Sequence, residues 1–126
     1  MQVRDIPAVM SIQEESYSAE LLESEAVICN RLAASPQLAW VAEDDEGVCA
    51  YLFAYRSRVG KVTPLDGEFQ PHAEADCLYL HDLAVSRRAS GRGIGPALVR
   101  KNLEQARAHQ LRYSALVSVQ ESEAFW

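Results

Sequence analysis

Two adjoining segments decide how this chain folds: CLYLHDLAV at residues 77–85 and SGRGIGP at residues 90–96. The first has the length and the apolar and aromatic content that are typical of a strand. The second holds three glycines at alternate positions. After it, apolar residues such as Leu98 and Leu103 recur at helical spacing to about His109. The stretch therefore predicts a strand, a glycine-rich turn and a helix in direct succession.

The glycine-rich turn has the properties of an anion-binding site. Gly91, Gly93 and Gly95 allow backbone conformations that are closed to other residues, and they let a ligand approach closely. The first N–H groups of the following helix have no partner within it, and the helix dipole places roughly half a positive charge there. Pro96 suits the first helical position. We expect a pyrophosphate here, because a plain connector would lose roughly 0.5–1 kcal/mol per glycine without return.

The spacing of the turn excludes two common phosphate-binding motifs. The dinucleotide fingerprint GxGxxG fails, because Pro96 or Leu98 stands where its last glycine should be. A P-loop fails, because no Gly-Lys-Ser or Gly-Lys-Thr follows the turn. Arg87, Arg88 and Arg92 add local positive charge to a chain whose formal net charge is −6. That net charge argues against a nucleic-acid partner.

The rest of the chain alternates between helical and strand-like segments. We expect a helix over 6–17 and a second helix that contains Leu21, Leu22, Ile28 and Leu32 and ends at Ser35-Pro36. Strands are expected at 38–43 and 48–56, followed by a loop over 57–76. After the turn and its helix we expect a strand at 112–119 and the start of another helix at 121–126. Residues 44–47 make a good hairpin turn. This order predicts one α/β (mixed α+β) domain over residues 1–126, with a central mixed sheet flanked by helices.

Composition places the chain among ordinary globular proteins, with 126 residues of which 48% are hydrophobic and 24% charged. No apolar run is long enough to span a bilayer, and the first residues lack the layout of a signal peptide. We therefore expect a cytoplasmic protein with no membrane contact. Cys29, Cys49 and Cys77 show no paired spacing, so we expect neither disulfides nor a metal site.

The sequence resembles the GNAT-type N-acetyltransferases. The resemblance is carried by Leu83-Ala84-Val85 at the strand end and by residues 91–98, which match the cofactor motif of that family, R/Q-x-x-G-x-G/A. It implies acetyl-CoA as co-substrate, with the pantetheine arm along the strand and the pyrophosphate on the turn. The cofactor-binding residues that it implies are Leu83, Ala84, Val85, Ser90, Gly91, Arg92, Gly93, Ile94, Gly95 and Pro96. It also implies the element order (β)-α-α-β-β-β-α-β-α.

Three departures from the family pattern stand out. Ser90 replaces the arginine or glutamine that opens the motif, although Arg88 is close enough in sequence to substitute in part. Trp126 stands where the family often has a tyrosine that protonates the thiolate. The family fold is shortened here at both ends: its first strand is reduced to residues 1–3, and its last helix and strands are missing. We therefore expect a fragment or shortened form, or a homodimer in which another copy covers the open sheet edge.

His81 is the candidate catalytic base. Strand alternation puts Tyr79, His81, Leu83 and Val85 on one face, so His81 and Tyr79 should line the cofactor cavity. The unperturbed pKa of histidine suits proton removal near neutrality, and His81-x-Leu-Ala-Val resembles the motif of arylalkylamine-type members. The alternative is a histidine packed at the strand edge and bonded to backbone. Asp82, on the other face, is expected to be structural.

These residues lead to one predicted function and two alternatives. We predict an N-acetyltransferase that moves acetyl from acetyl-CoA to a primary amine of a small molecule or peptide. Direct attack is favoured over a cysteine acyl-enzyme, because Cys77 and His81 are about 13 Å apart along a strand. The alternatives are a CoA-binding or interaction module without efficient turnover, and a phosphate-binding structural domain. The loop 57–76 is either a lid over the acceptor or a disordered connection.

Overall fold

A single four-stranded sheet, in the order β1-β2-β3-β4, organises the computed structural model, which describes all of residues 1–126. Strands β1 (Ala39–Asp44) and β2 (Gly47–Ser57) form the expected hairpin, and β2 is also antiparallel to β3 (Cys77–Val85). The last strand, β4 (Tyr113–Leu116), is parallel to β3, because the helix between them crosses over the sheet. The predicted mixed sheet is confirmed.

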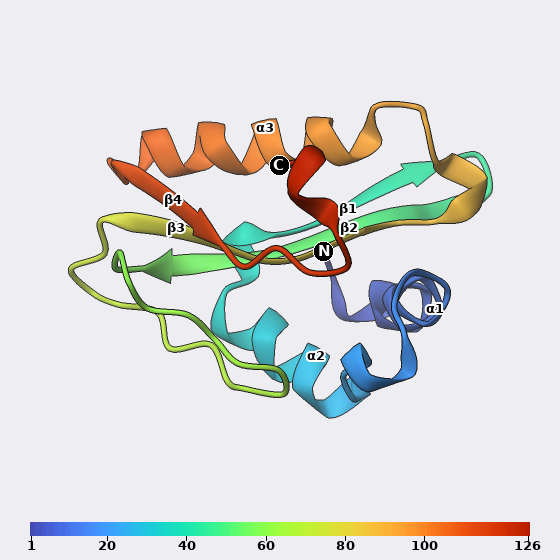
Figure 1. Ribbon diagram of the computed structural model, residues 1–126, viewed down its shortest axis with the longest axis horizontal. Helices are drawn as coiled ribbons and strands as arrows, with labels where there is room; N and C mark the ends of the chain where they lie inside the picture. The colour runs from blue at the N-terminus through green and yellow to red at the C-terminus, as the bar shows by residue number, and fades with distance from the viewer.

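Helices cover both faces of this sheet. Figure 1 shows α1 (Ile6–Ser16) and α2 (Glu25–Ala34) below it and α3 (Ile94–Ala108) above it. Ser24 caps α2, its hydroxyl accepting the N–H of Val27. Five short 3-10 turns complete the chain: Val3–Asp5, Ala19–Leu21, Pro36–Leu38, Arg87–Ala89 and Ser122–Ala124.

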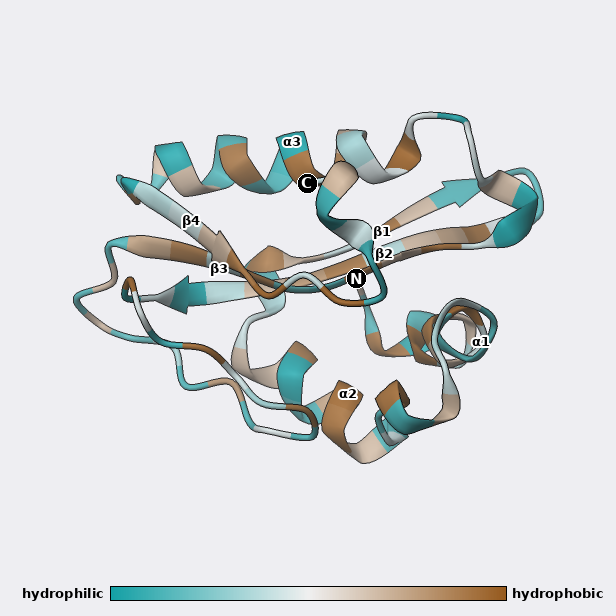
Figure 2. Cartoon of the chain, viewed as in Figure 1, coloured by the Kyte–Doolittle hydropathy of each residue, from teal (hydrophilic) through white to brown (hydrophobic).

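Two hydrophobic cores lie on the two faces of the sheet. Val9 and Ile28 bring α1 and α2 onto an aromatic face that includes Tyr51 and Tyr79. On the other face of the sheet, Leu98 and neighbouring residues of α3 pack against aliphatic side chains, most of which belong to β2 and β3. Figure 2 shows α3 banded in brown and teal, as expected for a helix with one buried side. The central strand β2 is buried on both faces, so it is nearly continuous in apolar residues.

A bulge in β3 corrects the predicted strand faces. Phe53 is opposite Asp82 but the next residue of β2 is opposite Leu80, so His81 is an extra residue in β3. The alternation therefore changes at His81. Leu83 packs in the α3 core while Tyr79 packs in the core under α1 and α2, so the expected common face of Tyr79, His81, Leu83 and Val85 is wrong.

Strands β3 and β4 pair only over part of their length. Their last paired residues are Leu80 and Leu116, so from His81 to Val85 the strand β3 is paired with β2 only. The predicted strand over 112–119 is thus too long, because β4 ends at Leu116 and the valines beyond it, Val117 and Val119, are 53% and 41% exposed. The bulge and the end of pairing occur side by side, and together they open the sheet.

Three further expectations at element boundaries are wrong. The second helix begins at Glu25, so Leu21 and Leu22 precede it. Residues 1–3 form no strand stub; Val3 opens a 3-10 turn, and the amino-terminal ammonium donates to the Ala39 carbonyl at 2.9 Å. At the other end, residues 121–126 contain only a 3-10 turn rather than a helix start.

Candidate active site

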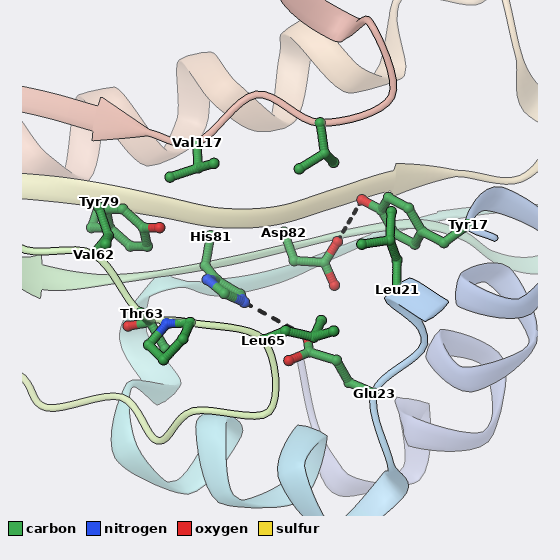
Figure 3. Close-up of a pocket in the computed structure, with 12 residues that line it drawn as sticks. Tyr17, Leu21, Glu23, Val62, Thr63, Leu65, Tyr79, His81, Asp82 and Val117 are labelled. Carbon is green, nitrogen blue, oxygen red and sulfur yellow. Dashed lines mark hydrogen bonds and ion pairs between the residues drawn. The ribbon is translucent and has the colours of Figure 1, made fainter. Parts of the chain in front are cut away.

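Two adjoining cavities lie where the sheet opens. The first, which we call the loop-side cavity, has a volume of about 310 Å³ and lies between β3, the segment before α2 and the loop 58–76 (Figure 3). The second, the turn-side cavity, has about 240 Å³ and lies between the part of β3 that has no β4 partner and the carboxyl-terminal segment. The residues common to both walls are Tyr17, His81, Val117 and Val119.

The glycine-rich turn ends beside the turn-side cavity. Gly91 and Gly93 have φ angles of +77° and +75°, a region that disfavours residues with a side chain, and no atom lies within 4 Å of where a Cβ would stand. A Cβ at Gly95 would stand 3.2 Å from the ring of Phe125 and 3.6 Å from Val85, which both line the cavity. The backbone therefore lies open to solvent at the first two glycines and against the cavity wall at the third.

No side chain caps the amino-terminus of α3. The first bonded N–H is that of Ala97, which donates to the Gly93 carbonyl at 3.2 Å, so the N–H groups of Ile94 and Gly95 have no backbone partner. Pro96 has no N–H to satisfy. These unpaired donors, with the helix dipole, fit an anionic group such as a pyrophosphate.

The arginines near this turn are paired with the β1–β2 hairpin. The guanidinium of Arg88 donates to carboxylates of Asp44 and Glu46, and that of Arg92 donates to Asp44 at 3.1 Å. The hydrogen bond from Arg88 is the main reason that the pKa of Asp44 falls to about 2. Both arginines are thus held by the carboxylates of the hairpin. Ser90 itself is exposed and bonds only within its own turn.

The open edge of β3 carries the backbone groups of Leu83 and Val85. The N–H of Ser86 donates to Cys49 of β2 at 2.8 Å, and alternate residues of a strand direct their backbone groups to opposite edges. The carbonyl of Leu83 lies 2.9 Å from the Tyr17 hydroxyl and shares its single proton with Asp82. The side chain of Ala84 is buried in the core under α1 and α2.

Asp82 is a buried carboxylate held by two tyrosines. The hydroxyls of Tyr17 and Tyr51 donate to its two oxygens at 2.7 and 2.8 Å. Burial raises the pKa of Asp82, and burial with the nearby Asp82 charge raises that of Tyr17. Asp82 lines the loop-side cavity together with His81 and Tyr79, so its expected place on the opposite face is wrong. Sequence reasoning missed Tyr17, which borders both cavities.

His81 lies at the junction of the two cavities, and its side chain is 10% exposed. Its Nε2 is 3.6 Å from a carboxylate oxygen of Glu23, and its ring packs edge-on against Phe69 at 5.3 Å. The other ring nitrogen, Nδ1, is buried without a hydrogen-bond partner. The ring therefore makes no hydrogen bond to backbone. Tyr79, with its ring 5.9 Å away, lines only the loop-side cavity, and burial raises its pKa.

A buried ion pair under the loop-side cavity was missed entirely. Arg31 of α2 is fully buried and donates to both carboxylate oxygens of Glu23. Burial alone would raise the pKa of Glu23, but contacts with His81 and Arg31 outweigh it and lower the pKa to about 2. One sequence signal was present: Arg31 lies beside Leu32 and three residues after Ile28, within an apolar helical stripe where a charge is unusual.

The loop 58–76 is docked against the body of the protein. Its Thr63 hydroxyl and the Tyr55 hydroxyl share a hydrogen bond of 2.6 Å. The Gly67 carbonyl accepts from Arg31 at 3.0 Å, and the ring of Phe69 lies under that guanidinium at 5.1 Å. The alternative of a disordered connection is therefore wrong, and the loop forms one wall of a cavity.

The cysteines and metal-binding side chains add no second site. Cys49 and Cys77 are buried and Cys29 is half-buried, all as free thiols. Burial raises the pKa of the Cys49 and Cys77 thiols, which makes them poor nucleophiles. No group of three or more His, Cys, Asp or Glu side chains is arranged to hold a metal ion. No helix has both the length and the apolar character that crossing a bilayer requires.

Solved structures with this fold include proteins that bind CoA esters. A GNAT-like decarboxylase, GphF in complex with isobutyryl-CoA, is 20% identical, with a TM-score of 0.71 over 85% of this chain and 57% of that one. The loading GNATL domain of CurA from Lyngbya majuscula is 14% identical, with a TM-score of 0.78 over 100% of this chain and 66% of that one. A Brucella melitensis GNAT acetyltransferase in complex with acetyl-CoA is 24% identical, with a TM-score of 0.68 over 99% and 77%.

This chain thus spans 57% and 66% of the length of the first two structures. At these identities the likeness concerns the fold. No curated protein sequence matches the chain. The profile described as "Acetyltransferase (GNAT) family" matches residues 6–126, which include the opened sheet, the glycine turn and α3. The chain therefore belongs to the GNAT family of acetyltransferases.

Proposed function

We propose that this protein is an N-acetyltransferase that transfers the acetyl group of acetyl-CoA directly to a primary amine. The observation that carries the proposal is the pair of cavities that meet at His81. One cavity lies beside the open amino-terminus of α3 and suits the cofactor, while the other suits an acceptor. A group at their junction can reach both reacting molecules, which direct transfer requires.

The cofactor would use backbone groups at the start of α3 and along the open edge of β3, where the Leu83 carbonyl is already engaged by the Tyr17 hydroxyl. The N–H groups at Ile94 and Gly95 suit the pyrophosphate, and the open edge of β3 at Leu83 and Val85 suits the pantetheine arm. Residues 90–93 and Pro96 complete the turn. This arrangement would bring the thioester to the common wall of the two cavities.

In the proposed reaction, the acceptor nitrogen attacks the thioester carbonyl carbon. The new C–N bond forms, the C–S bond breaks, and CoA leaves as a thiolate. The nitrogen gives up a proton to the imidazole of His81, directly or through one water. Tyr79 would line the acceptor side of this site. The buried thiols argue against a cysteine acyl-enzyme.

The lining of the loop-side cavity favours an acceptor with an apolar body. Leu21, Leu65 and Val117 are among its walls, and no lysine or arginine lines it. Its two carboxylates are already paired, Glu23 with Arg31 and Asp82 with tyrosines. A second charge on the acceptor would find no partner, so a compact amine with one nitrogen fits best.

Calorimetry with CoA, dephospho-CoA and ADP tests the cofactor half of the proposal. A GNAT cofactor site should prefer CoA clearly, because the pantetheine arm adds contacts along β3. Equal affinity for all three would indicate a generic anion site instead. Release of free thiol from acetyl-CoA in the presence of an amine panel then separates an enzyme from a CoA-binding module without turnover.

Replacing His81 tests its role as base. His81→Ala should lower kcat and flatten the rise of turnover with pH, while the affinity for CoA stays the same, because the ring is not needed to hold the pyrophosphate. His109→Ala, at the carboxyl end of α3, is the matched control and should leave turnover unchanged. Normal turnover in His81→Ala would remove His81 from the mechanism.

A further inference from the structure

One buried carboxylate contacts both the proposed base and the loop that walls the acceptor cavity. Oε1 of Glu23 lies 3.6 Å from Nε2 of His81, and Oε2 accepts a hydrogen bond from the backbone N–H of Asp66 at 2.8 Å. The side chain of Glu23 is 4% exposed, so water does not compete for either contact. Figure 3 shows Glu23 reaching toward His81 from the segment below β3.

Glu23 is itself fixed from two sides. The side chain of Gln13 on α1 accepts the Glu23 N–H at 2.7 Å and donates to the Glu23 carbonyl at 3.0 Å. Arg31 on α2 binds both carboxylate oxygens and also donates to the Gly67 carbonyl at 3.0 Å. The carboxylate is therefore a rigid point between two helices, β3 and the loop.

This geometry selects one neutral form of the imidazole. A negative charge close to Nε2 favours the tautomer with the proton on that nitrogen. The lone pair then lies on Nδ1 of His81, which is buried and has no partner. An unpaired acceptor in a site that is nine-tenths buried is costly unless something binds it. Nδ1 is thus the nitrogen that carries the lone pair in this tautomer.

We propose that Glu23 is a positioning residue that uses one carboxylate for two tasks: it keeps the proton of neutral His81 on Nε2, and it holds the loop at Asp66 against the acceptor cavity. The proposal rests on the proposed function only in calling His81 the base. When the imidazole takes up a proton, the resulting imidazolium keeps its Nε2–H beside the Glu23 carboxylate, which stabilises the new positive charge. Base orientation and loop docking therefore depend on the same charge.

The test compares Glu23→Gln with Glu20→Gln, which makes the same chemical change at an exposed residue three positions earlier. The ¹⁵N shifts of the His81 ring report the tautomer without any need for catalysis. Trypsin reports loop docking, because Arg58 and Lys61 are exposed cleavage sites within the loop. We expect a dominant Nε2–H tautomer in the wild type and in Glu20→Gln. In Glu23→Gln we expect a mixture of tautomers and cleavage of the loop about tenfold faster.

Kinetics supply the third readout. Glu23→Gln should lower kcat about 100-fold and leave KM for acetyl-CoA unchanged, since Glu23 lines only the loop-side cavity. If Glu23→Gln does not fold, Glu23→Asp keeps the charge for Arg31 but draws the carboxylate away from His81, and the same loss of tautomer preference is expected.

Unchanged tautomer or unchanged cleavage in the Glu23 variant would overturn the proposal, whatever the enzyme acetylates. Conversely, a protein that acetylates no amine would refute the proposed function while the tautomer and cleavage results still stand. The two failures are therefore distinguishable.

Discussion

Replacing Arg31 with methionine gives the most direct test of the buried polar network. Methionine preserves much of the length of the side chain but removes the charge and every donor. The change breaks the contacts with both Glu23 oxygens and the hydrogen bonds to the Gly67 carbonyl. It also removes the cation from the ring of Phe69. The carboxylate of Glu23 is then left buried without its main counter-charge.

Loss of one partner of a buried pair costs about 3–5 kcal/mol. For a chain of this size that corresponds to a fall in Tm of about 10–20 °C. Urea and thermal unfolding followed by circular dichroism at pH 7 measure it, with the exposed Arg100→Met as control. Glu23→Leu combined with Arg31→Met should recover much of the loss, because an apolar pair replaces the stranded charge. A cost below about 1 kcal/mol, or a double variant as unstable as the sum of both changes, would refute the reasoning.

The same pair predicts how stability depends on pH. The pKa of Glu23 is about 2 in the folded chain, against an ordinary value of 4.5. A carboxyl group whose pKa is lower in the folded than in the unfolded chain stabilises the fold. This stabilisation is complete above the pKa of the unfolded chain, and it is lost as the pH falls to the pKa of the folded chain. Wild-type stability should therefore decline between about pH 4.5 and pH 2. Arg31→Met should show a smaller decline, since part of the lowering is gone. An equal decline in both proteins would contradict this assignment.

Two further substitutions probe the turn and the tyrosine cluster. Gly93→Ala should lower the free energy of unfolding by about 1–2 kcal/mol, because φ is +75°, and should weaken CoA binding measured by calorimetry. The control Gly60→Ala, with φ of +90° in the distant loop, should lower stability by a similar amount but leave CoA affinity intact. Tyr17→Phe should cost about 1–3 kcal/mol in urea unfolding, because Asp82 loses one of its two hydroxyl donors, whereas Tyr113→Phe at an exposed position should change stability by less than about 0.5 kcal/mol. If both glycine variants lose CoA affinity equally, the turn at Gly93 is not part of the cofactor site. If both tyrosine variants are equally stable, the hydrogen bond from Tyr17 to Asp82 does not stabilise the fold.

Elements with a strong local pattern could be predicted from the sequence. The hairpin, the strand at 77–85 and α3 follow from hydrophobic runs and turn chemistry, and the observed bounds differ by only one or two residues. Weaker segments were misjudged for identifiable reasons. Leu21 and Leu22 look helical by spacing, but Ser24 provides the cap and α2 begins after it. Val117 and Val119 look like strand residues, but β4 has no ladder partner beyond Leu116.

What the sequence determined by itself is local: the glycines at 91 and 93 with positive φ, the uncapped start of α3, and the strand that leads to them. These depend on backbone conformation within a few residues, so their chemistry is readable from residue order. The acceptor side was decided only by the tertiary structure. The bulge at His81 arises from pairing with β2, and it reverses which side chains face α3. Glu23, Arg31 and Asp66 meet only when α2 and the loop pack together, because a buried charge is stable only beside a partner that folding brings to it.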